Sequence, residues 1–380
     1  MDVQLFASSN SLSKMDDSLR FAQTMARNCY SDKSLEEITK EAFKPELIDR
    51  IINGGHHSVF GHFMLTFKIK GIPKILAMIL NNEKVYETSE QSARYTQMKN
   101  MDHYQRQLYD KWMKILIPRI DEIYPNFNSK SRRRNIKKLA QENARYMTSV
   151  FTPSSMMHTL SLRQLNFIQS EFDRFILSNI NTSDEFKKRL IPYVFDFLEQ
   201  TKAYRIPGLD NQTDRHLSLF NTKIRESKEI FDEVYCTSYL ASYAAFAQLQ
   251  RHRTLNYFVS NAFDHPGTLG FFVPKIIRDD DKLVNEWNSD IGSVAETDFP
   301  QGRLISVKES GHLEDFKSKL ILRLCGHVQY EVMELTKILA QKYSVYVPEL
   351  ERYVSTKCSR GQKCHLPCVW GPENALERLI

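Results

Sequence analysis

The most constraining stretch of this sequence is an apolar, aromatic run that ends in a cluster of cations. Residues 239–246 read Tyr-Leu-Ala-Ser-Tyr-Ala-Ala-Phe, and Arg251-His252-Arg253 follows a few positions later. Guanidinium groups stay charged when they lose water, and they bind phosphate or carboxylate through two parallel hydrogen bonds. The stretch therefore predicts either a site for a multiply anionic ligand at the end of a core element, or a solvated helix end where cations favour the negative pole.

The size and composition of the chain fit a globular protein with a large core. The chain has 380 residues, of which 42% are hydrophobic, and this length allows one large domain or two. Charges interrupt every apolar run, and the first residues lack the features of a signal peptide, so we expect a cytoplasmic protein without a membrane span. The net charge of +6 suits small anionic ligands as well as nucleic acid and decides nothing alone.

The first quarter of the chain has clear helix and strand signals. Residues 45–52 begin with proline and are followed by Gly54-Gly55, which predicts a short helix. Residues 63–70 alternate between apolar and polar side chains, which predicts a strand. After a Gly-Ile-Pro turn, residues 74–80 predict an apolar helix.

Two polar regions follow. Residues 81–96 are dense in hydrogen-bonding groups and are either part of a ligand site or an ordinary loop and cap. Residues 103–140 predict solvent-facing helix and contain the strongest positive patch, Lys130 to Lys138. That patch can bind nucleic acid or polyphosphate, but it lacks interleaved aromatic residues, so a solvated helix face is favoured.

In the second half, residues 203–211 carry turn signals and are the candidate linker. Residues 233–239 predict a strand, the acidic stretch 278–290 predicts a surface loop, and residues 316–343 predict one long helix. On that helix Arg323, His327 and Glu331 would form one row at four-residue spacing, either as part of a site or as a salt-bridged surface.

Three of the six cysteines cluster near the C-terminus. Cys358, Cys364, His365 and Cys368 supply four ligand types that zinc accepts within a short segment. Their spacing differs from the common paired Cys-x2-Cys arrangement, so reduced thiols in a loop are the alternative. The six cysteines do not form a secreted disulfide framework.

Taken together, these stretches resemble the flavin-dependent thymidylate synthase family, with its motifs divided between two tandem copies. The first copy has Gly55-His56-His57-Ser58 and a Ser-x-Arg-Tyr at residues 92–95, but Asn82-Glu83-Lys84 where Arg-His-Arg belongs. The second copy has Gln248 and the Arg-His-Arg at residues 251–253, but Ser260-Asn261-Ala262-Phe263 where Ser-x-Arg-Tyr belongs.

The division continues downstream. The first copy keeps Ala144-Arg145 and Ser161-Leu162-Arg163, which resembles the family's flavin-contacting Asn-x-Arg. The second copy keeps Leu322-Arg323 and the stretch from His327 to Glu331. Such complementary loss is expected when each copy contributes one half of a composite site.

The resemblance implies an α+β fold in which two copies, each a mainly antiparallel sheet packed with long helices, form a pseudo-dimer. The copies would span residues 1–205 and 206–380, the second with the Cys-rich tail. Two such chains would form a homodimer that mimics a tetramer, with dUMP as the small-molecule partner and neither membrane nor nucleic acid as a partner.

The resemblance also implies the chemistry, which is the reductive methylation of dUMP to dTMP by an FAD-dependent methyltransferase. Methylenetetrahydrofolate would supply the carbon and NADPH the hydride. Arg323 would be the catalytic residue, stabilising negative charge on the pyrimidine. The residues implied in dUMP binding are Gln248, Arg251, Glu90, Ser92, Arg94 and Arg145. The residues implied in FAD binding are Ser58, Arg251, His252, Arg253, Ser161, Arg163 and His327.

Two alternatives stay open. One is another C5-modifying enzyme of a pyrimidine nucleotide on the same scaffold. The other is a non-catalytic nucleotide- or RNA-binding protein that uses the patch Lys130 to Lys138. No cysteine nucleophile is required in the flavin reading, because the cofactor carries the redox chemistry.

Overall fold

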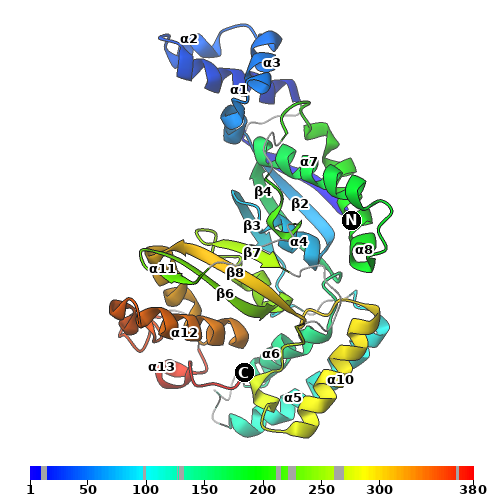
Figure 1. Ribbon diagram of the computed structural model, residues 1–380, viewed down its shortest axis with the longest axis vertical. Helices are drawn as coiled ribbons and strands as arrows, with labels where there is room; N and C mark the ends of the chain where they lie inside the picture. The colour runs from blue at the N-terminus through cyan, green and yellow to red at the C-terminus, as the bar shows by residue number, and fades with distance from the viewer. Residues whose placement is uncertain are drawn as a thin grey trace. The chain divides into compact units, whose positions relative to one another are not determined.

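The computed structural model describes residues 1–9, 15–96, 100–125, 127, 132–210, 215–220, 228–260, 269–364 and 368–380. The chain divides into two compact units, and each consists of two separate segments. The first unit contains residues 1–91 and 153–220, and the second contains residues 92–152 and 221–380. Each unit is built around its own sheet (Figure 1).

The first unit contains an antiparallel four-stranded sheet in the order β1-β2-β4-β3. Its strands are β1 (Asp2–Ser8), β2 (Met64–Pro73), β3 (Tyr86–Glu90) and β4 (Pro153–Ser161). The alternation expected for residues 63–70 is confirmed, since Leu65, Phe67 and Ile69 are buried on one face. The register places Met64 opposite Ser161, which brings the start of β2 to the end of β4.

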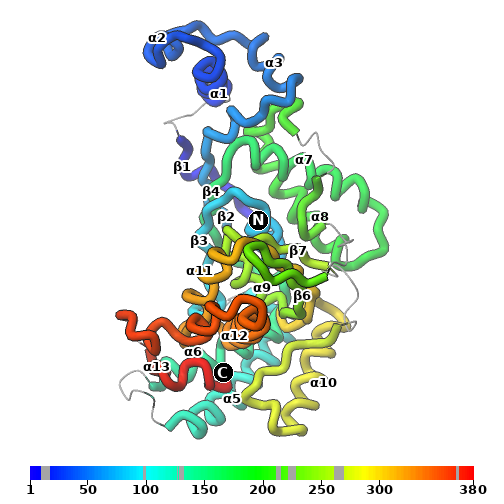
Figure 2. The backbone as a smooth tube through the Cα atoms, turned by 60° about the vertical axis from the view of Figure 1, so that its left-hand side comes forward, coloured from blue at the N-terminus to red at the C-terminus, as the bar shows by residue number. Residues whose placement is uncertain are grey.

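Helices complete the first unit. The region before β2 forms a small helical group, visible as the blue segments of Figure 2. The expected helix from Pro45 is confirmed, with proline in its first turn and Gly54 as its C-cap. The elements are α1 (Met15–Tyr30), α2 (Leu35–Thr39), α3 (Pro45–Asn53), η1 (His57–His62), α4 (Lys74–Leu80), α7 (Leu162–Asn179), α8 (Glu185–Thr201), η3 (Lys202–Tyr204) and η4 (Ser218–Phe220).

The second unit repeats the plan of the first sheet. Its antiparallel four-stranded sheet has the order β5-β6-β8-β7. The strands are β5 (Ile230–Phe231), β6 (Val234–Ser242), β7 (Asn256–Ser260) and β8 (Leu304–His312). In both sheets the second strand leads directly into a buried helix of seven residues, α4 in the first and α9 (Tyr243–Leu249) in the second. The α+β class is thus confirmed, and the two sheets are consistent with tandem copies.

The remaining helices of the second unit come from both halves of the sequence. From the first half come α5 (His103–Ile123), α6 (Arg132–Ala144) and η2 (Arg145–Met147). From the second half come η5 (Lys275–Ile277), α10 (Asp281–Thr297), α11 (Leu313–Arg323), α12 (Tyr330–Ser344), η6 (Pro348–Tyr353) and α13 (Gly371–Asn374). Helices α5 and α10 lie side by side (Figure 2), and their Trp112 and Trp287 rings pack 4.7 Å apart. No helix in the described ranges is both long and apolar enough to cross a membrane.

Two expectations about the second half were wrong. The acidic stretch is not a loop but the start of α10, because Asp280 caps the helix and Trp287, Ile291 and Val294 bury one face. The single helix expected over residues 316–343 is two helices, since the chain leaves the helical path at Leu324 and re-enters at Tyr330.

A glycine within this break lets Trp370 approach the backbone closely. A Cβ on Gly326 would lie 2.4 Å from Cδ1 of Trp370, so a residue with a side chain does not fit there. Arg323, His327 and Glu331 are consequently not a row on one helix. The first lies at the end of α11, the second in the connecting loop and the third in α12.

Candidate functional site

Cationic side chains from both halves of the sequence belong to the second unit. Arg94 follows β3 of the first sheet in the sequence, whereas Arg251 follows α9 and Arg323 ends α11. Burial, together with the positive charges of Arg94 and Arg251, lowers the pKa of Arg323 to about 10. Arg94 donates to the carbonyl oxygen of His327 in the loop that follows Arg323, and Arg251 adjoins His252, which binds Arg323. We call Arg94, Arg251 and Arg323 the arginine cluster.

Two hydrogen bonds fix the guanidinium group of Arg323. Its Nε donates to Nε2 of His252 over 2.6 Å, and its Nη2 donates to the carbonyl oxygen of Gln248 over 3.2 Å. The Gln248 side chain in turn accepts from the backbone N–H of Gln329. Three residues expected at the site, Gln248, His252 and Arg323, are therefore in direct contact.

His252 has to be neutral to accept this hydrogen bond, because only an unprotonated ring nitrogen is an acceptor. It is buried, with 7% of its surface exposed. Burial, with the charges of Arg323 and Lys319, lowers the pKa of His252 to about 2. Its Nε2 is thus a fixed acceptor across the physiological pH range.

This pKa predicts a pH dependence of stability. The unfolded chain takes up a proton on His252 near pH 6.5, while the folded protein does so only near pH 2. Stability is therefore complete above pH 6.5 and decreases as the pH falls below it. Between pH 7.5 and 5.0 the native protein should lose roughly 2 kcal/mol more unfolding free energy than His252→Gln.

Urea unfolding at the two pH values measures this difference. His103→Gln is the control, because His103 is an exposed residue at the start of α5. Its pH dependence should match the native protein within about 0.5 kcal/mol. Identical pH profiles for the native protein and His252→Gln would contradict the assignment.

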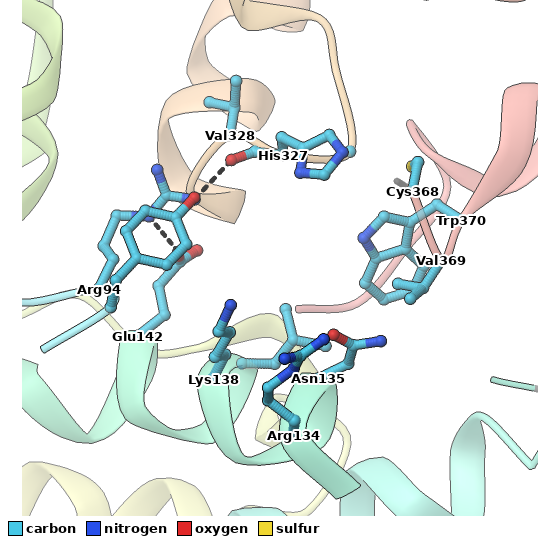
Figure 3. Close-up of a pocket in the computed structure, with 13 residues that line it drawn as sticks. Arg94, Arg134, Asn135, Lys138, Glu142, His327, Val328, Cys368, Val369 and Trp370 are labelled. Atoms are coloured by element: carbon cyan, nitrogen blue, oxygen red, sulfur yellow. Dashed lines mark hydrogen bonds and ion pairs between the residues drawn. The ribbon is translucent and has the colours of Figure 1, made fainter. Parts of the chain in front are cut away.

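Arg94 forms a buried ion pair with Glu142 of α6, and its Nη2 donates to the carbonyl oxygen of His327 over 2.5 Å. Figure 3 shows both interactions as dashed lines. Although burial alone would raise the pKa of Glu142, the charges of Arg94 and Arg145 lower it. Glu142 is therefore an anion that partly offsets the positive charge of the arginine cluster, and it fixes the direction of Arg94.

Arg145 lies in a buried polar network beside the cluster. Its Nη2 donates to Oε1 of Gln329 over 2.5 Å, and Nε2 of Gln329 donates to the hydroxyl of Tyr146 over 2.6 Å. That hydroxyl donates to Glu331, which also accepts from the backbone and side chain of Ser242. Since each of these groups is buried, the network holds η2, α9 and the start of α12 in fixed positions.

The loop between α11 and α12 is anchored by the C-terminal segment. The buried side chain of Arg378 donates to the carbonyl oxygens of Cys325 and Val328, over 3.3 and 2.6 Å. These carbonyls flank Gly326 and His327, so Arg378 sets the path of the loop that carries His327.

Four expected site residues belong to the first unit. Ser58 lies in η1 and is exposed, Ser161 caps α7, and Arg163 is exposed in the first turn of α7. Because η1 packs against α7, these three residues occupy the same end of the first sheet. Glu90 ends β3, where Lys74 and Asn81 bind its carboxylate.

The other expected residues are in or near the cluster segments. The Ser92 hydroxyl accepts from the backbone N–H of Arg94 and so shapes the turn before it. Arg253 is exposed beyond α9. Of the second-copy segment at residues 260–263, only Ser260 is described; Asn261, Ala262 and Phe263 lie outside the described residues.

The expected zinc ligands are only partly described. Cys358 is half-buried, and Cys364 and Cys368 are exposed. His365 lies outside the described residues. Within the described part of the chain, no three His, Cys, Asp or Glu residues are grouped as metal ligands. Zinc binding stays a prediction that nothing here supports.

Sequence reasoning missed two residues that organise the site. Glu142 precedes Arg145 by three positions on a helix, but an acidic residue at that spacing is common on helix surfaces. Gln329 was noted only as part of a motif, although it bridges Arg145 and Tyr146. Only the contacts with residues from the other half of the sequence distinguish these two side chains from ordinary polar residues.

Fold and site together define an α+β protein with two similar antiparallel sheets and a partly buried cluster of arginines suited to an anionic ligand. Residues 11–172 match the family model described as thymidylate synthase complementing protein. A flavin-dependent thymidylate synthase of Thermococcus onnurineus is 24% identical over 129 residues. The chain is thus similar to the flavin-dependent thymidylate synthases over part of its length.

The matches cover only part of this chain, and their sequence identities are low. The segment shared with the Thermococcus enzyme covers 31% of this chain and 49% of the relative, so the chain matches about half the length of that curated protein. Among solved structures, thymidylate synthase X of Helicobacter pylori with FAD and dUMP is 19% identical, covering 55% of this chain and 99% of that one, with a TM-score of 0.32. The UMP/dUMP methylase PolB of Streptomyces cacaoi with 5-Br UMP is also 19% identical, covering 55% and 91%, with a TM-score of 0.30.

Proposed function

We propose that the protein catalyses the FAD-dependent reductive methylation of dUMP to dTMP. Methylenetetrahydrofolate would supply the carbon and NADPH the hydride. The observation that carries this proposal is the arginine cluster, in which Arg94 from the first half of the sequence binds the loop after Arg323, and Arg251 adjoins the His252 that holds Arg323. Three cations offset by one carboxylate, that of Glu142, favour an anionic ligand such as a nucleotide phosphate.

Each role below is part of this proposal, and the contacts of the residues support it. Arg94, Arg145 and Arg251 would neutralise the phosphate of dUMP, and Gln248, Ser92 and Glu90 would also bind the nucleotide. Arg323 is restrained, because His252 and Gln248 hold two of its nitrogens. A restrained cation needs little reorganisation as charge develops, so Arg323 would stabilise negative charge on the pyrimidine ring.

The residues expected to hold FAD are chemically suited to it. Arg251 and Arg253 can bind the pyrophosphate, and His252 and His327 offer ring nitrogens. In the first unit, Ser58, Ser161 and Arg163 share one end of the sheet, where hydroxyl and guanidinium donors suit a phosphate. FAD would carry electrons between NADPH and the substrate.

A binding and turnover experiment tests the proposal. The purified protein should show a flavin absorption spectrum or bind FAD at micromolar concentration, and it should oxidise NADPH faster when dUMP is present. Titration should find about one functional nucleotide site per chain, because the motifs of the two copies together make one set. An apoprotein that binds no FAD would overturn the proposal and favour a non-catalytic nucleotide- or RNA-binding protein.

The substrate is tested in the same assay. Parallel reactions with dUMP and UMP, followed by mass analysis of the product nucleotide, identify the sugar and the group added to C5. Methylation of UMP alone would replace dUMP with a ribonucleotide and support the alternative of a different C5-modifying enzyme. A homodimer of such chains in the cytoplasm completes the proposal, and light scattering measures the subunit number.

A further inference from the structure

Three cysteines that the proposed reaction does not use are grouped where the C-terminal segment meets the loop between α11 and α12. Cys325 lies in that loop and is half-buried, whereas Cys364 and Cys368 belong to the C-terminal segment and are exposed. Figure 3 shows Cys368 next to Trp370. An accessible thiol beside a second thiol is the usual arrangement of a redox-sensitive cysteine pair.

Cys368 lies against the residue that follows Cys325 in the chain. A Cβ on Gly326 would be 3.1 Å from Sγ of Cys368. Since neighbouring Cα atoms are about 3.8 Å apart, this sulfur lies no more than roughly 8.5 Å from Cα of Cys325. The Cys325 thiol accepts a hydrogen bond from the backbone N–H of His327, so its sulfur also lies beside Gly326. Rotation of the exposed Cys368 side chain can then bring the two sulfurs into contact.

Contacts outside the cysteines hold the two chain segments together. Trp370 packs against Gly326. The buried side chain of Arg378 donates to the carbonyl oxygens of Cys325 and Val328, over 3.3 and 2.6 Å. Because these contacts exist without a covalent bond, the two thiols meet at a high effective concentration. A disulfide between them therefore needs little rearrangement of the fold.

The two thiols differ in reactivity. Burial raises the pKa of the Cys325 thiol, and the nearby thiols of Cys368 and Cys364 raise it further, although the hydrogen bond from His327 opposes the rise. Cys325 is therefore a weak nucleophile at neutral pH, while Cys368 is exposed and open to small molecules. The accessible thiol reacts first and the sheltered thiol second.

We propose that Cys325 and Cys368 form a reversible disulfide when the protein meets a small-molecule disulfide such as glutathione disulfide. The Cys368 thiolate attacks one sulfur of glutathione disulfide, which forms a mixed disulfide and releases one glutathione thiolate. The Cys325 thiolate then attacks the sulfur of Cys368 and releases the second glutathione. Two cysteine thiols are oxidised, one glutathione disulfide is reduced, and the two protons pass to the released glutathione thiolates.

The bond joins the C-terminal segment to the loop between α11 and α12. Such a crosslink suppresses the local openings in which the segment leaves the loop. In a reducing compartment both thiols stay reduced, and the bond forms only when the pool of small-molecule disulfide rises. The inference is independent of the proposed function, because neither thiol has a role in that reaction.

Peptide mass mapping of the full chain tests the pair. The protein is incubated in glutathione buffers of increasing oxidised fraction, the remaining thiols are alkylated, and the digest is searched for linked peptides. The Cys325–Cys368 peptide should be the main crosslink, and dithiothreitol should reverse it. Hydrogen exchange in residues 368–380 should slow roughly tenfold or more in the oxidised protein.

Three variants separate the steps. Cys325→Ser should stop at the mixed disulfide, with glutathione retained on Cys368. Cys368→Ser should leave Cys325 to react at least about tenfold more slowly, because burial raises its pKa and limits access. Cys358→Ser is the control and should not change the Cys325–Cys368 bond. Cys358 is a half-buried cysteine of the same C-terminal segment, with its sulfur 3.1 Å from the Thr356 hydroxyl.

The outcomes that contradict the proposal are distinct. Absence of a Cys325–Cys368 crosslink, or a crosslink that joins either residue to Cys364 instead, would overturn it. About one equivalent of bound zinc per chain that protects both thiols from alkylation would overturn it as well. None of these measurements uses turnover, so failure of the thiol pair leaves the proposed reaction standing, and the reverse is also true.

Discussion

Arg323→Ala should lower the turnover number by about 10²–10³-fold, which is the typical cost of removing one preorganised electrostatic contact from an active site. The structure supports a large effect, because Arg323 is half-buried within the arginine cluster and is oriented by His252 and Gln248. Steady-state kinetics with dUMP measures it. A loss that appears mainly in kcat, with KM little changed, indicates a role in the transition state.

Two variants are the controls. Arg352→Ala removes the same charge from η6 in the second unit, where Arg352 is exposed and donates only to the hydroxyl of Tyr353. It should keep kcat within about threefold of the native value. Asn82→Ala alters the position where the first copy would need its own Arg-His-Arg, and it should also keep its activity. Loss of activity in Asn82→Ala equal to that in Arg323→Ala would contradict the composite site.

The structure adds a stability role for that first-copy position. Asn82 donates to the Ser218 hydroxyl, and the neighbouring Glu83 is buried and accepts from the backbone and hydroxyl of Ser218. Arg215 forms an ion pair with the same carboxylate. The side chains that replace the Arg-His-Arg motif thus hold the segment that follows the first copy. Asn82→Ala is expected to cost about 1 kcal/mol of stability without a loss of chemistry.

Local elements could be predicted from the sequence because their signals are local. The alternation of residues 63–70 determines a half-buried strand, and Pro45 and Gly54 delimit a helix wherever the rest of the chain lies. The break at Gly326 could not be predicted from helical spacing. Gly326 lies against Trp370, which is distant in sequence and occupies the space beside the glycine. The helical spacing of apolar residues continues from α11 into α12, so the sequence pattern gives no sign that the helix is interrupted between them.

The candidate site was predictable in its residue types but not in its assembly. Arginines next to core segments indicate anion binding, and the family motifs indicate which arginines to expect. The grouping of Arg94 and Arg145 with Arg323 depends on segment 92–152 packing into the second unit. The spacing of apolar residues in the sequence does not indicate that residues 92–152 pack into the second unit. Glu142 and Gln329 gain their importance only from it, which is why they were missed.

A buried ion pair determines where Arg323 is held. Lys319 lies one turn before Arg323 on α11, and its Nζ donates to both carboxylate oxygens of Glu309 over 2.7 Å. Both side chains are fully buried. The hydroxyls of Tyr235 and Tyr239 also donate to Glu309, so the carboxylate is fully satisfied. The pair therefore connects α11 to β6 and β8 and fixes the position of α11 along these strands.

Lys319→Met should accordingly destabilise the protein by about 3–5 kcal/mol, because it leaves the Glu309 carboxylate buried without a counter-charge. Adding Glu309→Gln should recover part of that loss, since the neutral amide needs no counter-charge. Urea unfolding measures both variants. Lys317→Met is the control on the same helix: its partners Glu314 and Glu349 are exposed, so it should cost less than about 1 kcal/mol.

The same variants test whether the buried Lys319–Glu309 pair affects His252 at the site. Because the charge of Lys319 helps to lower the pKa of His252, Lys319→Met should weaken the pH dependence of stability as well as the stability itself. The double variant recovers part of the stability but not that charge, so its pH profile should remain shallower than the native profile. Equal costs for Lys319→Met and Lys317→Met would show that Glu309 can reach water. The position of Arg323 would then depend on the contacts of its own guanidinium group rather than on this pair.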